Sequence, residues 1–383
     1  MHSSAKGVDL FIRPVLGTVA LAGLSSGRGM GEEANSMETR QCGRSDMRLS
    51  ALAVGCWAFG GGEYWGDQDQ NDVNAIVARA VDLGVNYFDT AEVYNDGWSE
   101  ESLGEALKEV ARDRVVIGTK IAPSNTEPDV LVKHCEASLR RLRTDRIDLY
   151  MVHWPITPIS IKHFTDQPVL PSVPDAFATL MRLREQGKIR HIGVSNFGVA
   201  KLDEAMGTGA EIVANELPHS LLTRGIEWEI LPYCREKNVG AIGYMALLQG
   251  VLADIYPTLD DVHPWQQRTR HFDSRRPGSL CRHGEEGVEE ETNRALGAIR
   301  AVARDCGMTV PELAVKWAVA AEGVTSVLVG SRNVKELEQN VRAASEPLDP
   351  DIVRRLNAAT EEVKRELGPH FDYYEGAQND RTA

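Results

Sequence analysis

The feature that most constrains this chain is an alternation of short apolar runs with helix-like segments from about residue 50 onward. The runs are rich in β-branched residues, and the segments between them repeat apolar residues at spacings of three and four. Such strands are typical of parallel sheets buried on both faces. Eight units favour a closed (β/α)8 TIM barrel over an open sheet. The predicted strands are 51–55, 85–89, 115–120, 147–153, 189–195, 212–215, 241–244 and 326–329.

An open doubly wound sheet is the alternative, and it predicts a glycine-rich phosphate turn after the first strand. Residues 60–62 are three glycines, but they lack the G-x-G-x-x-G spacing and open no immediate helix. Long connections at 155–172 and 250–289 are expected to be functional loops at the C-terminal face of the barrel. Helices are predicted at 72–83, 101–111, 129–142, 173–185, 226–237, 290–306 and 334–344.

The two ends of the chain differ from the alternating part. Residues 1–36 are interpreted as a disordered extension or a targeting segment, because an apolar run at 14–24 follows Lys6 and Arg13. We predict that residues 37–370 form the barrel and that 371–383 are a C-terminal tail, which either reaches over the barrel mouth or packs outside it.

Composition excludes several classes of function. There are 42 Lys and Arg against 56 Asp and Glu, and this net charge of −14 argues against nucleic acid or an anionic membrane as partner. No apolar run is long enough to span a bilayer. The six cysteines form no C-x-x-C pair, which predicts no metal site and favours a reducing, cytoplasmic location.

Ionisable residues stand at the ends of three successive predicted strands. Asp89 ends the second, Lys120 the third and His153 the fourth, while Tyr94 lies on the loop after Asp89. Each alone is more often structural. Together they are expected at one barrel rim, where a partly buried Lys and Asp are costly unless they pair.

Four motifs carry a resemblance to a known family. They are N-Y-F-D-T-A-E-V-Y at 86–94, G-T-K at 118–120, H-W at 153–154 and G-V-S-N-F at 193–197. In this order and at strand ends, they resemble the aldo-keto reductase family over about residues 37–344. The resemblance implies a (β/α)8 barrel that binds NADP(H) and reversibly reduces aldehydes or ketones. It also implies a catalytic tetrad of Asp89, Tyr94, Lys120 and His153.

The chemistry of these side chains suits those roles. A tyrosine with a pKa near ~10 is a reluctant base, and we expect the Lys120 ammonium to lower that pKa toward neutrality. Asp89 would neutralise Lys120, and His153 would donate a hydrogen bond to the carbonyl oxygen.

The resemblance also implies cofactor contacts. Ser195 and Asn196 would hold the nicotinamide carboxamide, and Tyr244 would stack on its ring. Glu216 stands where the family usually has Gln; it accepts hydrogen bonds, and its negative charge would favour the oxidised nicotinamide. The pyrophosphate would lie at Gln249 and Gly250. The adenosine 2′-phosphate and adenine would lie at Gly330, Ser331, Arg332, Glu336, Gln339 and Asn340. These residues surround a predicted helix N-terminus, and an anion site there favours NADP over NAD.

Aromatic residues are predicted to line the substrate pocket. They are Tyr64, Trp65, Trp98 and Trp154, with Glu63, Asn95 and Asp96 as polar partners. Aromatic faces stack on sugars and planar carbonyls alike, so a polyhydroxylated carbonyl compound is the expected substrate class.

Arginines on the long loop after the seventh strand allow two interpretations. Either Arg268 and Arg270 contact the cofactor phosphates, or the loop is solvated and its charge is balanced by the acidic run at 285–291. The other arginines of the loop are Arg275, Arg276 and Arg282.

Two other functions compete with carbonyl reduction. Lys120 at a strand end is also typical of Schiff-base aldolase-type lyases. A non-catalytic NADP-binding subunit that senses redox state is the second alternative. Neither the anion site at 330–332 nor Ser195 and Asn196 would be needed by a lyase.

Overall fold

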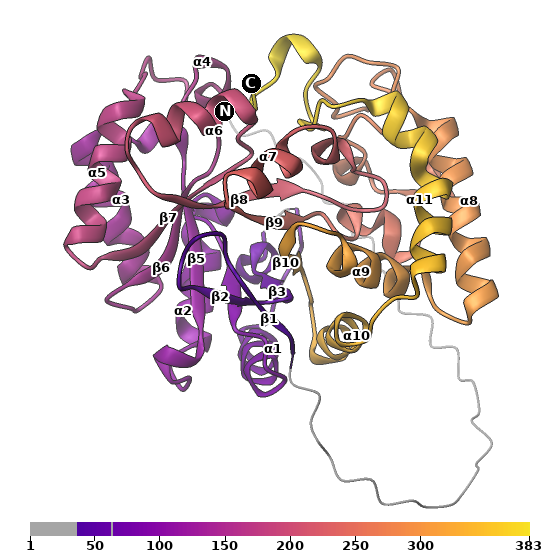
Figure 1. Ribbon diagram of the computed structural model, residues 1–383, viewed down its shortest axis with the longest axis horizontal. Helices are drawn as coiled ribbons and strands as arrows, with labels where there is room; N and C mark the ends of the chain where they lie inside the picture. Colours follow the sequence, from indigo (N-terminus) through magenta and orange to yellow (C-terminus); the bar gives the residue numbers. More distant parts are fainter. Residues whose placement is uncertain (1–36, 63) are drawn as a thin grey trace, which may run out of the picture. The chain divides into compact units, whose positions relative to one another are not determined.

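The computed structural model describes residues 37–62 and 64–383, and both interpretations of residues 1–36 lie outside that range. Eight parallel strands close into a barrel in the order β10-β3-β4-β5-β6-β7-β8-β9 (Figure 1). The predicted (β/α)8 barrel is confirmed. The strands are β3 (Leu52–Gly55), β4 (Tyr87–Asp89), β5 (Val116–Ile121), β6 (Ile147–Val152), β7 (Ile189–Ser195), β8 (Ile212–Pro218), β9 (Gly240–Tyr244) and β10 (Val324–Val329).

Helices surround this barrel, and two of them, α8 (Glu289–Cys306) and α11 (Pro350–Leu367), pack side by side on its outside (Figure 1). Helix α9 (Val310–Ala320) was not predicted. It buries residues on nearly every side, so its apolar residues form no single stripe. The others are α1 (Gln70–Asp82), α2 (Trp98–Ala106), α3 (Pro128–Arg141), α4 (Pro158–Ile161), α5 (Val173–Glu185), α6 (Val199–Gly207), α7 (Ile230–Glu236) and α10 (Val334–Ser345).

A short antiparallel hairpin precedes the barrel and was also not predicted. Its strands are β1 (Thr39–Gln41) and β2 (Arg48–Ser50). Cys42 and Leu49 are fully buried and belong to the same apolar cluster as barrel residues such as Leu149. The Cys42 thiol donates to the carbonyl oxygen of Val213 near the start of β8. The hairpin therefore closes the barrel at the end opposite the carboxyl ends of the strands.

The C-terminal tail packs across the loops at the other end of the barrel. The carbonyl oxygen of Tyr373 accepts from the amide of Arg270 at 2.7 Å, and its hydroxyl accepts from the amide of Gly225 at 2.8 Å. The carbonyl oxygen of Thr382 accepts from the amide of Gly198 at 2.9 Å. Residues that follow β7, β8 and β9 are thus tied together by the last turns of the chain.

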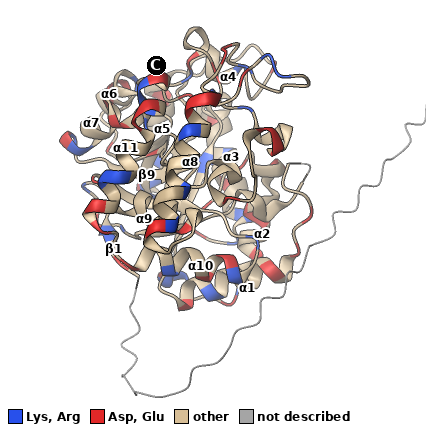
Figure 2. Cartoon of the chain, turned by 90° about the vertical axis from the view of Figure 1, so that its right-hand side faces the viewer, with Lys and Arg blue, Asp and Glu red and all other residues tan. Residues whose placement is uncertain are grey.

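Charged residues cover the outer helices. Figure 2 shows Lys and Arg interspersed with Asp and Glu along α1, α8 and α10. Across residues 37–62 and 64–383, none of the helices is both long and apolar enough to cross a membrane.

Candidate active site

The four side chains predicted from the strand ends meet at the carboxyl end of the barrel. The Lys120 ammonium is fully buried, and it donates to the Asp89 carboxylate and, at 2.9 Å, to the carbonyl oxygen of Thr90. It also lies 3.4 Å from the Tyr94 hydroxyl. The His153 ring lies edge-on to the Tyr94 ring, with centroids 5.7 Å apart. A phenol, an ammonium, a carboxylate and an imidazole therefore surround one point.

Tight packing at the strand ends holds Asp89 and Lys120 in place. Gly118 of β5 faces the Tyr87 ring of β4 so closely that a Cβ atom there would lie 2.4 Å from the Tyr87 hydroxyl. That hydroxyl donates to Asp89 at 3.1 Å. The glycine of the G-T-K motif thus makes room for the tyrosine that orients the Asp89 carboxylate.

Tyr94 begins a turn with unusual backbone angles. Asn95, Asp96 and Gly97 all have positive φ values, of 47°, 53° and 90°. Such conformations are costly for residues other than glycine and concentrate at functional sites. The Asn95 amide donates to the carbonyl oxygen of Gly60 at 2.7 Å, which ties this turn to the loop after β3.

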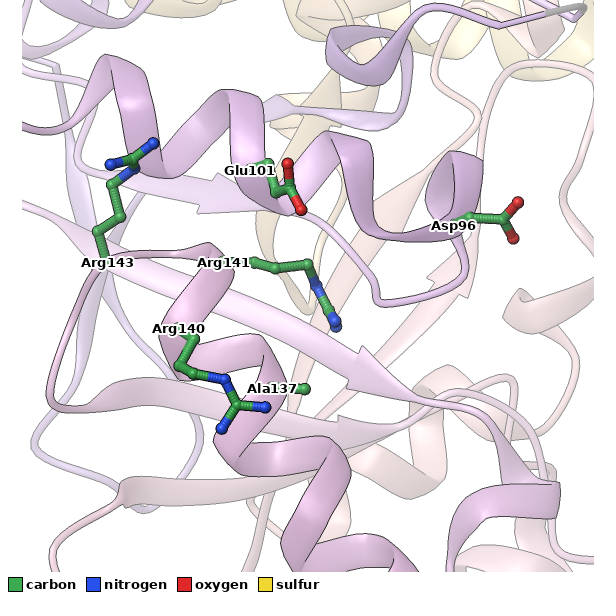
Figure 3. Close-up of a pocket in the computed structure, with 6 residues that line it drawn as sticks. All are labelled: Asp96, Glu101, Ala137, Arg140, Arg141 and Arg143. Atoms are coloured by element: carbon green, nitrogen blue, oxygen red, sulfur yellow. The ribbon is translucent and has the colours of Figure 1, made fainter.

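A hollow on the outside of the barrel backs the same turn (Figure 3). The Arg141 side chain fills the space beside Gly97, where a Cβ atom would lie 2.7 Å from it. Arg141 also pairs at 2.6 Å with the buried carboxylate of Glu100. None of the four converging side chains lines the hollow. Its residues support the turn that carries Tyr94 from the outside of the barrel. Its lining residues are Asp96, Glu101, Ala137, Arg140, Arg141 and Arg143.

The electrostatics of Tyr94 differ from the sequence-based expectation. Burial raises the pKa of Tyr94, and the charge of Asp89 raises it further, so that the lowering effect of Lys120 is outweighed. The expected shift of the Tyr94 pKa toward neutrality was therefore wrong. Tyr94 is therefore a protonated phenol, which suits a proton donor.

Lys120 and His153 have opposite shifts. Burial alone would lower the pKa of Lys120, but Asp89 and Glu216 reverse this and raise it above its ordinary value. Burial, Lys120 and Arg381 lower the pKa of His153 well below its ordinary value. At neutral pH the site therefore holds an ammonium ion beside a neutral imidazole, whose Nδ1 is buried without a hydrogen-bond partner.

Glu216 completes this cluster from β8. Its Oε1 lies 3.3 Å from the Lys120 ammonium, and its Oε2 is buried without a hydrogen-bond partner. Ser195 and Asn196 lie beside it. The Ser195 hydroxyl and the backbone N–H of Asn196 both donate to the backbone carbonyl oxygen of Glu216. The unpaired Oε2 of Glu216 is a buried acceptor of the kind that a carboxamide NH2 group needs.

The Asn196 side chain makes hydrogen bonds to three neighbouring residues. Its Nδ2 donates to the carbonyl oxygen of His153 at 3.1 Å and to Ser195 Oγ at 3.0 Å. Its Oδ1 accepts from the Tyr244 hydroxyl at 2.7 Å. These bonds hold the Tyr244 ring, the predicted stacking partner, next to the predicted carboxamide residues.

The predicted 2′-phosphate residues lie at the start of α10. The Arg332 guanidinium donates to Gln68 Oε1 and to the carbonyl oxygen of Asp67, both at 2.6 Å, and to that of Trp65. The Glu336 carboxylate accepts from the Arg332 amide at 2.8 Å. Arg332 therefore ties the loop after β3 to the loop after β10. Asn340 bonds to Ser331 at 3.1 Å, and Gln339 is exposed.

Gln249 and Gly250 follow β9 in left-handed backbone conformations, with φ values of 52° and 101°. The Gln249 amide donates to the Tyr374 hydroxyl of the tail, and its Oε1 is buried without a partner. Gly330 directly follows β10 and lies next to Gly55 at the end of the adjacent strand β3.

An aromatic stack leads away from Tyr94 and includes a residue that sequence analysis missed. Trp57 stacks on Tyr94, with ring centroids 5.6 Å apart, and on Tyr64 at 5.0 Å. Trp65 lies edge-on to both Trp57 and Tyr64. Trp98 is 60% exposed, in contrast to these rings. The sequence contains one indication of Trp57 as a site residue: it lies two residues after the end of the first predicted strand.

Trp154 is covered by the C-terminal tail. The Arg381 guanidinium lies 3.8 Å from the centroid of the Trp154 ring and pairs at 2.7 Å with Asp372. The tail therefore reaches over the barrel mouth, one of the two positions considered for it. Sequence analysis missed Arg381, which lies more than two hundred residues from Trp154 in the chain. Glu63, a predicted polar partner, lies outside the described residues.

The loop arginines fall into two groups. Arg270, Arg275 and Arg276 pair with Glu285, Glu286 and Glu289, and Arg282 pairs with Glu375 of the tail. Arg268 differs: its guanidinium lies over the Tyr64 and Tyr374 rings, 5.1 and 5.8 Å from their centroids, and its Nε has no partner. The charge-balanced interpretation describes the first group, and Arg268 alone faces the aromatic stack.

The chain matches known proteins over most of its length. Residues 51–361 match the model of the Aldo/keto reductase family. The chain is 29% identical over 344 residues to the NADH-specific methylglyoxal reductase of Escherichia coli (strain K12), covering 83% of this chain and 98% of that protein. It is 32% identical over 304 residues to an uncharacterized oxidoreductase of Mycobacterium tuberculosis, covering 78% and 85%.

Solved structures show the same fold. The glycerol dehydrogenase from Gluconobacter oxydans superimposes with a TM-score of 0.67 at 27% identity. The match covers 86% of this chain and 96% of that one.

Proposed function

Because the chain belongs to the aldo/keto reductase family, we propose that it is an NADP(H)-dependent oxidoreductase that reversibly interconverts a carbonyl compound and its alcohol. The observation that carries this proposal is the meeting of Tyr94, Lys120, Asp89 and His153. When bound, the cofactor would supply the hydride. Ser195, Asn196, Glu216 and Tyr244 would hold its nicotinamide end.

The side chains of this chain would supply the proton and the charge stabilisation. Tyr94, kept protonated by its surroundings, donates a proton to the oxygen of the reduced carbonyl. The neutral imidazole of His153 donates a hydrogen bond that orients the same oxygen and stabilises its developing negative charge. Lys120 lies 3.4 Å from the phenol oxygen and stabilises the phenolate that remains.

The experiment that tests this proposal is a carbonyl screen with purified protein. We expect loss of the absorbance of the reduced nicotinamide when NADPH is mixed with aldehydes, ketones or keto-sugars. A protein that binds NADPH but turns over none of these substrates would instead support the non-catalytic redox-sensing subunit.

The alternative lyase chemistry is disfavoured by the surroundings of Lys120. A Schiff base forms only from a neutral amine. Here Asp89 and Glu216 raise the pKa of Lys120 and keep it an ammonium ion. Borohydride would be expected to trap no substrate on Lys120, whereas trapping without added cofactor would support the lyase.

Cofactor preference is testable at Arg332. Replacing Arg332 with alanine is expected to weaken NADPH binding ~10–100-fold, because a charged hydrogen bond to the 2′-phosphate contributes about 1.5–3 kcal/mol. NADH binding should change by less than about twofold, and Arg342→Ala, at an exposed arginine of the adjacent helix α10, should leave both affinities unchanged. Dissociation constants follow from quenching of tryptophan fluorescence.

Equal weakening of NADPH and NADH would mean that Arg332 only holds the loop at 65–68. Tighter binding of NADH than of NADPH by the unmodified protein would assign NAD(H) as the cofactor. The name of the Escherichia coli relative, an NADH-specific reductase, makes this comparison necessary.

The substrate class that we propose is a polyhydroxylated carbonyl compound such as a keto-sugar. Trp57, Tyr64 and Trp65 form a cluster of aromatic rings next to Tyr94, and aromatic rings of this kind pack on sugar rings. Asn95 offers a polar group on the turn that carries Tyr94, whereas Asp96 lines the hollow on the outside of the barrel.

The pH dependence of the two directions should differ. The pKa of Tyr94 is raised, so the phenol stays protonated through neutral pH, and kcat/KM for reduction should be constant from about pH 6 to about pH 9. It should fall only above the ordinary tyrosine pKa of ~10. Alcohol oxidation needs the phenolate and should therefore accelerate with rising pH over the same range. A reduction rate that falls through neutral pH would contradict this assignment of Tyr94.

A further inference from the structure

The buried cluster around Lys120 contains two carboxyl groups but a single ammonium ion. Asp89 and Glu216, from β4 and β8, both contact the same ammonium ion, and all three side chains are less than 5% exposed. Two ionised carboxylates would leave the cluster with a net negative charge inside the barrel. Such a charge is costly to bury, so one carboxyl group retains its proton.

The groups around Glu216 point to it as the proton carrier. Burial raises the pKa of Glu216 well above its ordinary value, and the charge of Asp89 raises it further, against the opposing effect of Lys120. Its titratable neighbours on the packed elements are Tyr87 and Asp89 of β4, Tyr94 of the following turn, Lys120 of β5 and Tyr244 of β9. The only cation among these groups is Lys120, which Asp89 already pairs.

We propose that Glu216 is a carboxylic acid that stores a proton for Tyr94 and becomes a carboxylate when the oxidised cofactor occupies the site. The inference rests on the proposed function. It goes beyond a contact to the carboxamide because it gives Glu216 two charge states in one catalytic cycle.

The proton path runs through Lys120, which lies between Tyr94 and Glu216. After Tyr94 has given its proton to the product oxygen, the Lys120 ammonium gives a proton to the phenolate across 3.4 Å. The Glu216 carboxyl group then gives its proton to the Lys120 amine across 3.3 Å. One O–H bond is broken on Glu216 and one forms on Tyr94, while Lys120 ends as it began. Bulk water need not enter the buried site for this step.

The charge on the cofactor explains why Glu216 releases its proton at that stage. An oxidised nicotinamide ring carries a positive charge and the reduced ring carries none. A positive charge near Glu216 favours its carboxylate. A glutamine at this position would accept a hydrogen bond equally well but has no proton to transfer.

Calorimetry of cofactor binding tests the proposal without turnover. Titrations with NADP+ and NADPH in buffers of different ionisation enthalpy count the protons released on binding. The unmodified protein should release most of one additional proton with NADP+ compared with NADPH at neutral pH. Its affinity for NADP+ relative to NADPH should rise by up to ~tenfold per pH unit. In Glu216→Gln both effects should disappear.

Two further variants keep the test decisive. Asp89→Asn leaves Lys120 with a single carboxylate, so Glu216 is ionised before binding and the additional proton release should also be lost. Glu92→Gln alters another buried glutamate, one that accepts from the Ala122 amide at 2.9 Å, and should retain the release.

Equal proton release by the unmodified protein and Glu216→Gln would overturn the inference, as would a cofactor preference that does not change with pH. These outcomes differ from a failure of the proposed function. That failure would appear as an absence of NADP(H) binding, or as full activity of a Tyr94→Phe variant.

Discussion

Replacing Tyr94 with phenylalanine is expected to lower kcat for carbonyl reduction ~10²–10⁴-fold, the usual contribution of a positioned acid. The phenylalanine ring keeps the stacking on Trp57 and the edge contact with His153. Only the hydroxyl beside Lys120 is lost. The dissociation constant for NADPH should therefore stay the same, which fluorescence quenching measures on the same samples.

A matched control is available on the outside of the barrel. Tyr233 lies on α7, and its hydroxyl donates to the surface carboxylate of Asp203. Tyr233→Phe should leave both kcat and the dissociation constant unchanged. Full activity of Tyr94→Phe would show that another group is the acid, and weaker cofactor binding with unchanged kcat would make Tyr94 a binding residue.

Replacing Lys120 with methionine should destabilise the fold by about 3–5 kcal/mol, the cost of removing one partner of a buried ion pair. Asp89 and Glu216 would be left inside the barrel without their cation. Urea denaturation followed by tryptophan fluorescence measures the free energy of unfolding. Activity should also be lost, because Lys120 no longer stabilises the Tyr94 phenolate.

The stability loss in Lys120→Met should depend on pH in a defined direction. Without the ammonium ion, burial raises the folded-state pKa of both carboxyl groups above their unfolded values of ~4. Both are neutral and cause little loss near or below pH ~4, and the loss grows as the pH rises toward the folded pKa values. It should therefore be larger at about pH 8 than at about pH 5.

Two comparisons isolate the cause. Adding Glu216→Gln to Lys120→Met removes one of the unpaired carboxyl groups and should restore part of the lost stability. Lys316 is an equally buried lysine, but its partner Glu346 is 59% exposed. Lys316→Met should therefore cost less than Lys120→Met and show little pH dependence. Equal losses for the two lysine variants would contradict the charge argument.

Secondary structure was predictable where burial leaves a simple pattern. Strands such as β6 and β10 are buried along their whole length, so they appear in the sequence as runs of mainly apolar residues. Helix α5 has the predicted bounds because Ser172 caps its start and an apolar stripe follows. The hairpin β1–β2 was missed because its strands have three residues each, too few for a periodic signal.

Parts of the site were predictable for a topological reason. In a closed barrel of parallel strands, residues at the carboxyl ends of different strands must share one rim. Asp89, Lys120 and His153 could therefore be placed together from their positions at strand ends. The tail and Trp57 offered no such constraint: Arg381 reaches Trp154 only through the path of the folded chain after α11.

The amino-acid sequence by itself determined the barrel, the rim and the kinds of chemical group that gather there, because apolar periodicity and strand order depend on local spacing along the chain. The tertiary structure alone decided the charge states of those groups. Lys120 contacts two carboxyl groups rather than one. Burial, helped by the Asp89 charge, raises the pKa of Tyr94 against the lowering effect of Lys120. Electrostatic interactions depend on distances between side chains from remote segments, and folding sets those distances.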